Sequence, residues 1–328
     1  MARPSRQSAE FEAAALEFAI SAPKRRALVV VNPYATTVSD RLRSLVVHAL
    51  SARYEVDAID TQSPGHATEI CREGAWEGYD VVIAFGGDGT VNEVVNGLAG
   101  SPTPVTCLPG GRTNVYCKLL GIPGEIVDAT EHLLRMADAW RTRLVDVGVV
   151  NDRRFAFSSG VGLDANVVAQ VDAHPGLKSR LGASYFVYTA LGTFAGRYVL
   201  RPPRLVATVN GTEVPGVTAV IQNAEHYTYF NDSPVDVAEG AGLDTAELAG
   251  VVLGRANLID VPSILIRMLA RRPALIGHPQ IRVLGGFTEL DLRSVDGRPI
   301  PLHVDGDYIG DVTDAHFEIR PRGLSVVS

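Results

Sequence analysis

Cysteine is scarce in this sequence and long apolar runs are missing, and each scarcity excludes a class of protein. Three cysteines, Cys71, Cys107 and Cys117, are far apart in 328 residues. They therefore form neither a disulfide framework nor a recognisable zinc site, and we expect reduced, mostly buried thiols in a cytoplasmic protein. No uninterrupted apolar run is long enough to span a bilayer. Charged residues interrupt the first 23 positions, so we expect no signal peptide.

An excess of basic residues is lacking as well. Lysine and arginine number 30 against 37 aspartates and glutamates, for a formal net charge of −7. A nucleic-acid binder needs a concentrated basic face, so this class is not expected. Hydrophobic residues make up 46% and charged residues 20%, which is typical of a folded globular protein. The length suits two domains.

The first half of the chain alternates short β-branched runs with helix-like stretches. This alternation predicts an α/β domain built from βαβ units around a parallel sheet. We expect it to span residues 24–140, after a flexible N-terminal arm at residues 1–23 that has one or two helical turns around 11–19. The expected strands are residues 27–31, 54–59, 80–85 and 104–108, and the expected helices are 38–51, 67–77, 90–99 and 126–139.

From residue 141 to 328 the pattern predicts a β-rich domain. The expected strands are residues 143–150, 154–161, 205–210, 217–223, 247–253, 290–294 and 300–304. Asn210-Gly211, Asp296-Gly297 and Asp305-Gly306 are strong hairpin signals. A last strand at 316–320 is a candidate to return to the first domain.

The strongest sign of a ligand site lies between the expected strand 80–85 and the helix that follows it. Its residues are Gly86, Gly87, Asp88, Gly89 and Thr90. Glycines let the backbone approach a ligand closely, and a helix N-terminus offers N–H groups to phosphate. Asp88 would repel a polyphosphate unless Mg²⁺ bridges the two, so the loop predicts metal–nucleotide binding. As an alternative, Thr90 and Glu93 have the spacing of a capping box at the start of the helix. A capping box would explain Glu93, but it would not explain the three glycines or Asp88.

Two further loops are expected at the same edge of the sheet. Asn32-Pro33 ends the first strand, and residues 109–114 follow the fourth. Ligands bind outside the carboxyl ends of the strands in a doubly wound sheet, so the three loops can converge on one crevice. Each loop alone could be an ordinary turn or helix cap.

Taken in order, these motifs resemble the bacterial diacylglycerol kinase and sphingosine kinase family. The resemblance runs from about residue 26 to the C-terminus, whereas the glycine-aspartate loop alone is shared with NAD kinases. It is carried by Asn32-Pro33, residues 86–90, Asn92-Glu93, Asn96-Gly97, residues 108–114, Asp146-Val147-Gly148, residues 157–162, Gly277-His278-Pro279 and Asp305-Gly306-Asp307.

The resemblance implies a fold and an activity. The N-terminal domain would be NAD kinase-like, with a doubly wound, mainly parallel sheet, and a C-terminal β-sandwich would hold the lipid. The activity would be that of an ATP-dependent lipid kinase that uses Mg²⁺ and converts diacylglycerol to phosphatidic acid. Such an enzyme would be cytoplasmic and associate peripherally with the membrane that holds its lipid substrate. Nucleic acid is not an expected partner, and a homodimer is one expected assembly.

The resemblance also implies roles for individual residues. The ATP site would be lined by Asn32, Pro33, Gly86, Gly87, Asp88, Gly89, Thr90, Asn92, Glu93, Gly111, Thr113 and Asn114. Asp305 and Asp307 are alternatives for the general base, and Asp88 would act in catalysis through Mg²⁺. Asp236, Glu239 and the carbonyl of Ala241 would hold a structural Mg²⁺, unless these carboxylates are merely solvated.

Departures from the family pattern keep alternatives open. Residues 34–37 replace a Ser-Gly step after Asn32-Pro33, and Arg112 replaces a small or hydroxylated residue. A non-catalytic nucleotide- or lipid-binding regulator is therefore one alternative, and a kinase of a sphingoid base, a polyprenol or NAD is another. The stretch 258–276 predicts an amphipathic helix that either lies on an anionic membrane or packs on the core.

Overall fold

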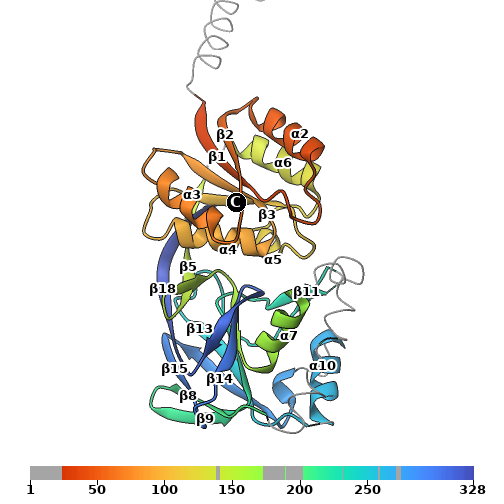
Figure 1. Cartoon of the computed structure of the whole chain (residues 1–328), viewed down its shortest axis with the longest axis vertical. Helices are drawn as coiled ribbons and strands as arrows, with labels where there is room; N and C mark the ends of the chain where they lie inside the picture. Colours follow the sequence, from red (N-terminus) through yellow and green to blue (C-terminus); the bar gives the residue numbers. More distant parts are fainter. Residues whose placement is uncertain are drawn as a thin grey trace, which may run out of the picture.

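The computed structural model describes residues 24–137, 141–172, 189, 202–230, 232–257, 259–270 and 275–328. The predicted N-terminal arm, including the helical turns around 11–19, lies outside these residues. An α/β half and a β-rich half are stacked along the long axis of the molecule (Figure 1). Across these ranges, no helix combines the length and the apolar character needed to cross a membrane. All three cysteines are free and buried, as predicted.

The α/β half contains the four predicted strands, which pair in parallel in the order β2-β1-β3-β4. The strands are β1 (Arg25–Val31), β2 (Tyr54–Asp60), β3 (Val81–Gly86) and β4 (Val105–Pro109). Residues 81–86 and 105–109 are buried throughout, because helices cover both faces of the sheet. The predicted α/β architecture is confirmed.

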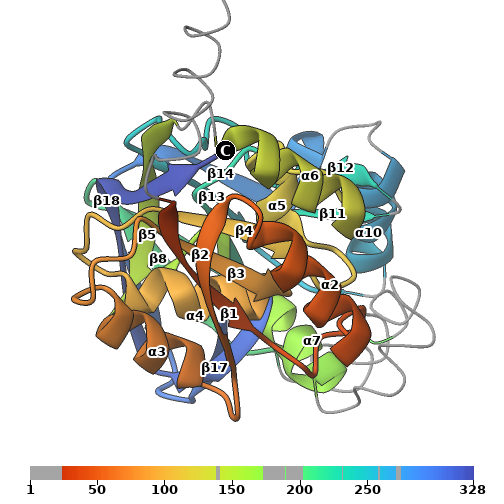
Figure 2. The ribbon, with the colours of Figure 1, turned by 90° about the horizontal axis from the view of Figure 1, so that it is seen from above.

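Helices connect these strands in the predicted alternation. They are α2 (Asp40–Leu50), α3 (His66–Gly74), α4 (Asp88–Gly97), α5 (Val115–Leu119) and α6 (Ile126–Met136). Helix α2 packs beside α6 and α3 beside α4, on opposite faces of the strands (Figure 2). Helix α5 was not predicted, since five residues are too few to show a helical period.

A single long strand connects the two halves. Strand β18 (Asp314–Val327) pairs in parallel with β4, where Val326 lies opposite Val105. It also pairs antiparallel with β5 (Thr142–Val150) and with β15 (Glu289–Ser294). The sheet continues through β8 (Leu205–Val209) to β9 (Thr212–Gly216), so it runs from one half into the other (Figure 1).

A second, antiparallel sheet faces the first in the β-rich half. Its order is β14-β13-β10-β7-β16-β17. The two sheets share a core that includes Phe155 and Phe317 of the first sheet and Ile221 and Leu302 of the second. This packing confirms the predicted sandwich. The strands are β14 (Ile281–Phe287), β13 (Leu248–Leu253), β10 (Thr218–Gln222), β7 (Ser158–Val161), β16 (Ile300–Val304) and β17 (Asp307–Val312).

Two of the three predicted hairpins are present, and the third is wrong. Asn210-Gly211 joins β8 to β9, and Asp305-Gly306 joins β16 to β17, with positive φ at both residues of each turn. Positive φ at both central positions is typical of a type I′ hairpin. Asp296-Gly297 instead connects β15 to β16, which belong to different sheets. The Asp-Gly pair there makes a turn between layers.

The remaining elements lie on the β-rich half. The predicted strand 154–161 is two strands, β6 (Arg153–Phe155) and β7, because the N–H groups of Ala156 and Phe157 donate to Asp305. The predicted helix 258–276 contains α10 (Asp260–Ala270) and the 3₁₀ turn η2 (Leu275–Gly277), and residues 271–274 lie outside the described part. Three more elements are α7 (Leu163–Asp172), β11 (Thr228–Phe230) and β12 (Ser233–Val235).

Candidate functional site

Hydrogen bonds tie together the loops that follow β1, β3 and β4. The N–H of Asn32 donates to the carbonyl of Phe85 (2.9 Å), and the N–H of Gly110 donates to the carbonyl of Gly86 (2.9 Å). The Asn32 amide also donates to Thr90 Oγ1 (3.1 Å). The three predicted loops therefore meet at the carboxyl edge of the parallel strands.

Close packing between these loops requires glycine. A Cβ on Gly86 would overlap the side chain of Thr90, and one on Gly110 would lie 2.8 Å from the Cα of Gly86. A Cβ on Gly111 would lie 2.9 Å from the Cα of Gly87. A side chain at Gly110 or Gly111 would therefore separate the loop after β4 from the glycine loop, and one at Gly86 would displace Thr90.

Helix α4 starts within the glycine loop, two residues before the predicted start at Thr90. Its N-cap is Gly87, which has no side chain that could accept a hydrogen bond from the first turn. The first N–H groups of a helix have no partner within the helix, so they are available to an anion. The prediction that Thr90 caps this helix is wrong, because Thr90 lies in its first turn.

Asp88 links the glycine loop to helix α5. Its Oδ2 accepts from the N–H of Val115 and its Oδ1 from the N–H of Tyr116, both at 3.0 Å. These bonds satisfy the first turn of α5. Burial raises the pKa of Asp88 to about 6, although the same two N–H groups favour its ionised form. Each carboxylate oxygen retains a further lone pair.

Asp307 reaches the glycine loop from the opposite half of the molecule. It is the first residue of β17 and is half-buried. A Cβ on Gly89 would overlap Oδ2 of Asp307 and would lie 3.1 Å from its Cγ. The Asp307 carboxylate therefore lies directly against the first turn of α4.

Asp305 is enclosed, unlike Asp307. The residue is only 3% exposed, and burial raises its pKa. Its carboxylate accepts from Asn92 Nδ2 (2.7 Å) and from the backbone N–H groups of Ala156 (2.7 Å), Phe157 (2.9 Å) and Ser158 (3.1 Å). Four donors hold this carboxylate in place. Asp305 is therefore better suited to fixing the hairpin that carries Asp307 than to accepting a proton.

Asn92 joins the two halves beneath the glycine loop. Its side chain is fully buried, and its Nδ2 donates to Asp305 Oδ2 and to the carbonyl of Arg154 (2.9 Å). Its Oδ1 accepts from Arg153 Nε (3.1 Å) and Nη2 (2.7 Å). These contacts use the donors and the acceptor of the amide, so Asn92 positions the hairpin. Sequence reasoning missed Arg153, which no motif marks.

Glu93 stabilises a fourth loop at the same edge of the sheet, the loop between β2 and α3. Its carboxylate accepts from the N–H groups of Gly65 (2.8 Å) and Ala67 (3.0 Å), which begin helix α3. The capping box predicted with Thr90 is therefore wrong, because Glu93 caps a neighbouring helix. The loop after β2, which contains the buried Thr61, was missed. Its position directly after a parallel strand could have identified it as a fourth loop of the site.

The loop after β4 is held by Asn114. This residue has a φ of 48°. Its Oδ1 accepts from the N–H of Gly111 (2.8 Å), and its Nδ2 donates to the carbonyl of Gly111 (2.9 Å). Thr113 is half-buried beside it, and Arg112 is exposed. Pro33 is half-buried in the first loop, so each predicted nucleotide-binding loop is placed at this edge.

The residues of the predicted structural metal site lie elsewhere, after β12. Asp236 Oδ1 pairs with His226 Nδ1 at 2.7 Å, while Glu239 is exposed and Ala241 is buried. In the described part of the chain, no group of three or more His, Cys, Asp or Glu residues converges on a point that could hold a metal. The structure gives Asp236 a hydrogen-bond partner, and the metal site stays a prediction.

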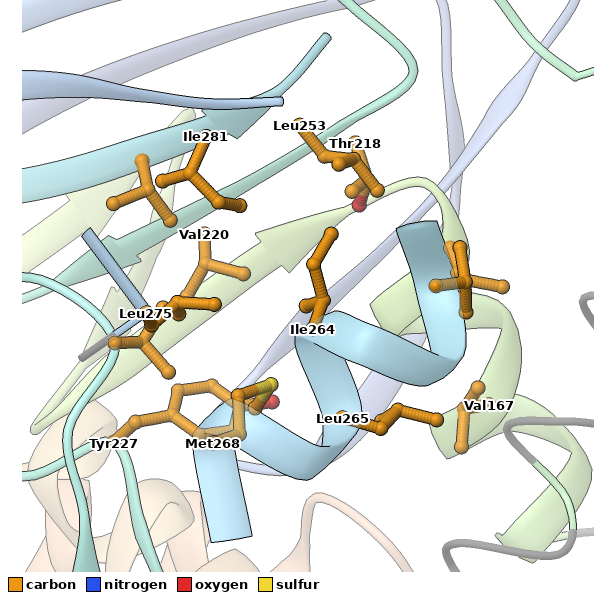
Figure 3. Close-up of a pocket in the computed structure, with 14 residues that line it drawn as sticks. Val167, Thr218, Val220, Tyr227, Leu253, Ile264, Leu265, Met268, Leu275 and Ile281 are labelled. Carbon is orange, nitrogen blue, oxygen red and sulfur yellow. The ribbon is translucent and has the colours of Figure 1, made fainter. Parts of the chain in front are cut away.

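An apolar pocket lies between α7, α10 and the second sheet (Figure 3). Its cavity has a volume of about 100 Å³. Thr218 and Tyr227 are the lining residues that carry a side-chain hydroxyl, and the other lining side chains are aliphatic or methionine. The lining residues are Leu163, Val167, Thr218, Val220, Tyr227, Val237, Val251, Leu253, Val261, Ile264, Leu265, Met268, Leu275 and Ile281.

Comparisons with known proteins agree with this arrangement. Residues 26–150 match the model of the diacylglycerol kinase catalytic domain. A diacylglycerol kinase of Staphylococcus aureus (strain bovine RF122 / ET3-1) is 35% identical over 312 residues, which cover 92% of each chain. The corresponding enzyme of Staphylococcus carnosus (strain TM300) is 25% identical over 309 residues, covering 88% of this chain and 90% of the relative. This chain belongs to the diacylglycerol kinase family.

A solved structure supports the same fold. The crystal structure of a diacylglycerol kinase from Bacillus anthracis str. Sterne superposes with a TM-score of 0.70 at 22% identity. The match covers 92% of this chain and 96% of that one, so both halves of this lipid kinase share the fold of that structure. The predicted family, fold class and enzyme class are confirmed.

Proposed function

We propose that this lipid kinase transfers the γ-phosphate of ATP to a hydroxyl group of diacylglycerol. The observation that carries the proposal is the contact between Asp307 and Gly89. It brings a carboxylate of the β-rich half onto the loop that is best suited to bind phosphate. Phosphoryl transfer depends mainly on positioning and charge neutralisation. This arrangement would supply the positioning, and the neutralisation would come from Mg²⁺ and the start of helix α4.

The nucleotide phosphates would bind at the start of α4. The uncapped N–H groups there and the glycines at positions 86, 87 and 89 suit a polyphosphate. Mg²⁺ would fit the same place, because the carboxylate of Asp88 is a hard oxygen donor and each of its oxygens retains a lone pair. One or two protein carboxylates are typical of a Mg²⁺ ion that takes its other ligands from phosphate and water. When bound, it would neutralise charge on the phosphates.

The acceptor would approach from the β-rich half. Asp307 would accept the proton of the attacking hydroxyl. This choice is supported by Asp305, whose carboxylate is already saturated by four donors. The apolar pocket behind α7 offers a place for the hydrocarbon part of a lipid. The relatives named diacylglycerol kinase favour diacylglycerol as the acceptor.

The deciding experiment measures phosphate transfer from γ-labelled ATP, with Mg²⁺, to lipids in mixed micelles. The panel contains diacylglycerol, sphingosine, ceramide and undecaprenol, with NAD in a parallel reaction. We expect labelled phosphatidic acid. Label in another product, or none despite ATP binding, would refute the proposed acceptor.

Asp88→Asn should lose most of this transfer while the protein stays folded. The amide cannot supply two anionic oxygens to Mg²⁺, and it turns an N–H group toward the start of α5. We expect kcat/KM for ATP to fall by about 10²-fold or more, which corresponds to roughly 3 kcal/mol of transition-state stabilisation. Circular dichroism would verify the fold, and Asp80→Asn, at the opposite end of β3, is the control. Full turnover by Asp88→Asn would exclude the metal-binding role.

Gly89→Ala should displace Asp307 without unfolding the enzyme. The new methyl would occupy the position of Asp307 Oδ2. A displacement of about 1 Å at a reacting group can cost on the order of 10²-fold in rate, whereas alanine is favourable within a helix. We therefore expect kcat to fall about 10²-fold with little change in Tm. Gly124→Ala is the matched control because nothing lies within 4 Å of its Cβ position. An unchanged kcat would show that Asp307 need not contact the loop.

A further inference from the structure

Helix α10 has two apolar faces. On the inner face Ile264, Leu265 and Met268 line the apolar pocket (Figure 3). On the outer side Ile266 is 64% exposed, and Ile259, the residue directly before α10, is 81% exposed. The two isoleucines are seven residues apart, which is two helical turns, so they form one stripe. An isoleucine pair exposed to this extent on one helix face points to a contact with an apolar phase.

The start of this helix is fixed, so the stripe is presented in a defined way. Asn257 Oδ1 accepts from the N–H groups of Ile259 (3.0 Å) and Asp260 (2.7 Å). The N–H of Ser263 donates to the carbonyl of Ile259 (3.3 Å), which places Ile259 in the first turn. Ile259 is therefore exposed within a hydrogen-bonded, capped helix start.

The charge of this segment is opposite to that of the whole chain. Residues 254–277 contain four arginines and one aspartate, whereas the chain has a net charge of −7. Arg255, four residues before Ile259, is exposed. A net positive segment that contains an apolar helical stripe suits the interface of a bilayer with anionic lipids. A second copy of the chain fits less well, because a two-fold contact would bring two net positive segments together.

We propose that α10 is the surface by which this kinase docks onto an anionic bilayer, with Ile259 and Ile266 inserted at the level of the headgroups. The docked helix would place the apolar pocket directly behind the membrane contact. The link to catalysis rests on the proposed function, since only a kinase of a membrane lipid gains from this placement. The docking itself is a separate property and is measured without turnover.

The test is an Ile259→Asp/Ile266→Asp variant in co-sedimentation with vesicles. With phosphatidylcholine–phosphatidylglycerol vesicles we expect the Kd for the vesicles to rise by at least about tenfold. Each aspartate replaces apolar area that docking would bury in the bilayer by a negative charge. Phosphorylation of diacylglycerol in those vesicles should fall in parallel. Phosphorylation of monomeric dihexanoylglycerol should not change, since neither isoleucine lines the pocket. Trp76→Asp and Val127→Asp are matched controls: these side chains are 90% and 72% exposed on the α/β half.

A second measurement does not depend on weakening the protein. In Ile266→Trp, the added fluorescence should shift to the blue when phosphatidylglycerol vesicles are mixed in, compared with the unmodified chain. Vesicle binding that is unchanged in the double aspartate variant, or the absence of a blue shift, would overturn the docking proposal. So would an unmodified dimer that the aspartates convert to a monomer. Vesicle binding through α10 without phosphorylation of either diacylglycerol would refute the proposed function and leave the docking intact.

Discussion

In Asp307→Asn, kcat should fall by about 10²–10⁴-fold while the KM for ATP changes little. The carboxylate lies against Gly89 at the start of α4, where the transferred phosphate and the acceptor hydroxyl would meet. An amide of the same size can neither take the proton nor supply a negative charge. Steady-state kinetics with diacylglycerol and varied ATP would measure both constants.

Two neighbouring substitutions make this prediction specific. Asp307→Glu should retain activity, because glutamate keeps the carboxylate and only lengthens the side chain by one methylene group. Asp311→Asn, four residues along the same strand, should have no effect, since that carboxylate is exposed and accepts from the Tyr308 hydroxyl. If Asp307→Asn turned over normally, the acceptor-side base would have to be another group.

Asp305→Asn should act mainly on stability. Its carboxylate accepts four hydrogen bonds, while an asparagine has one acceptor oxygen and would point an N–H group at a backbone N–H. Each buried donor left without a partner costs about 1–3 kcal/mol, so the free energy of unfolding should fall by roughly 2–5 kcal/mol. Urea denaturation followed by circular dichroism would measure this loss.

The control for Asp305 is a second aspartate that precedes a glycine. Asp296 is ion-paired with Arg298 at the surface, and Asp296→Asn should leave the denaturation midpoint almost unchanged. Activity of Asp305→Asn should fall as well, because the hairpin that positions Asp307 would loosen. If Asp305→Asn were as stable as the unmodified chain but lost kcat, Asp305 would be the base.

The parallel strands and their helices could be predicted because their signals are local. The β-branched runs at β1, β3 and β4 are buried on both faces, and the loops between them contain the glycines that the turns require. The convergence of these loops follows from the parallel arrangement, since all the strands end at one edge. The nucleotide-binding loops were therefore accessible from the sequence.

The role of single side chains could not be predicted because it depends on contacts distant in sequence. Asn92 lies beside glycine-loop residues in the chain, yet its amide meets Asp305, 213 positions away. Glu93 has the spacing of a capping box, but it caps helix α3. Asp296-Gly297 and Asp305-Gly306 are alike in sequence, and only the pairing of the flanking strands distinguishes a layer crossing from a hairpin.

The place of β18 in the sheet has a consequence for how the chain folds during synthesis. Strand β4 pairs with β3 on one side and with residue 326 of β18 on the other. While the ribosome is still making the β-rich half, the α/β half therefore lacks the strand that covers its edge. An uncovered edge invites pairing with other chains, so the nascent enzyme depends on rapid completion or on a chaperone. For the same reason, a fragment that ends before β5 should be prone to aggregation.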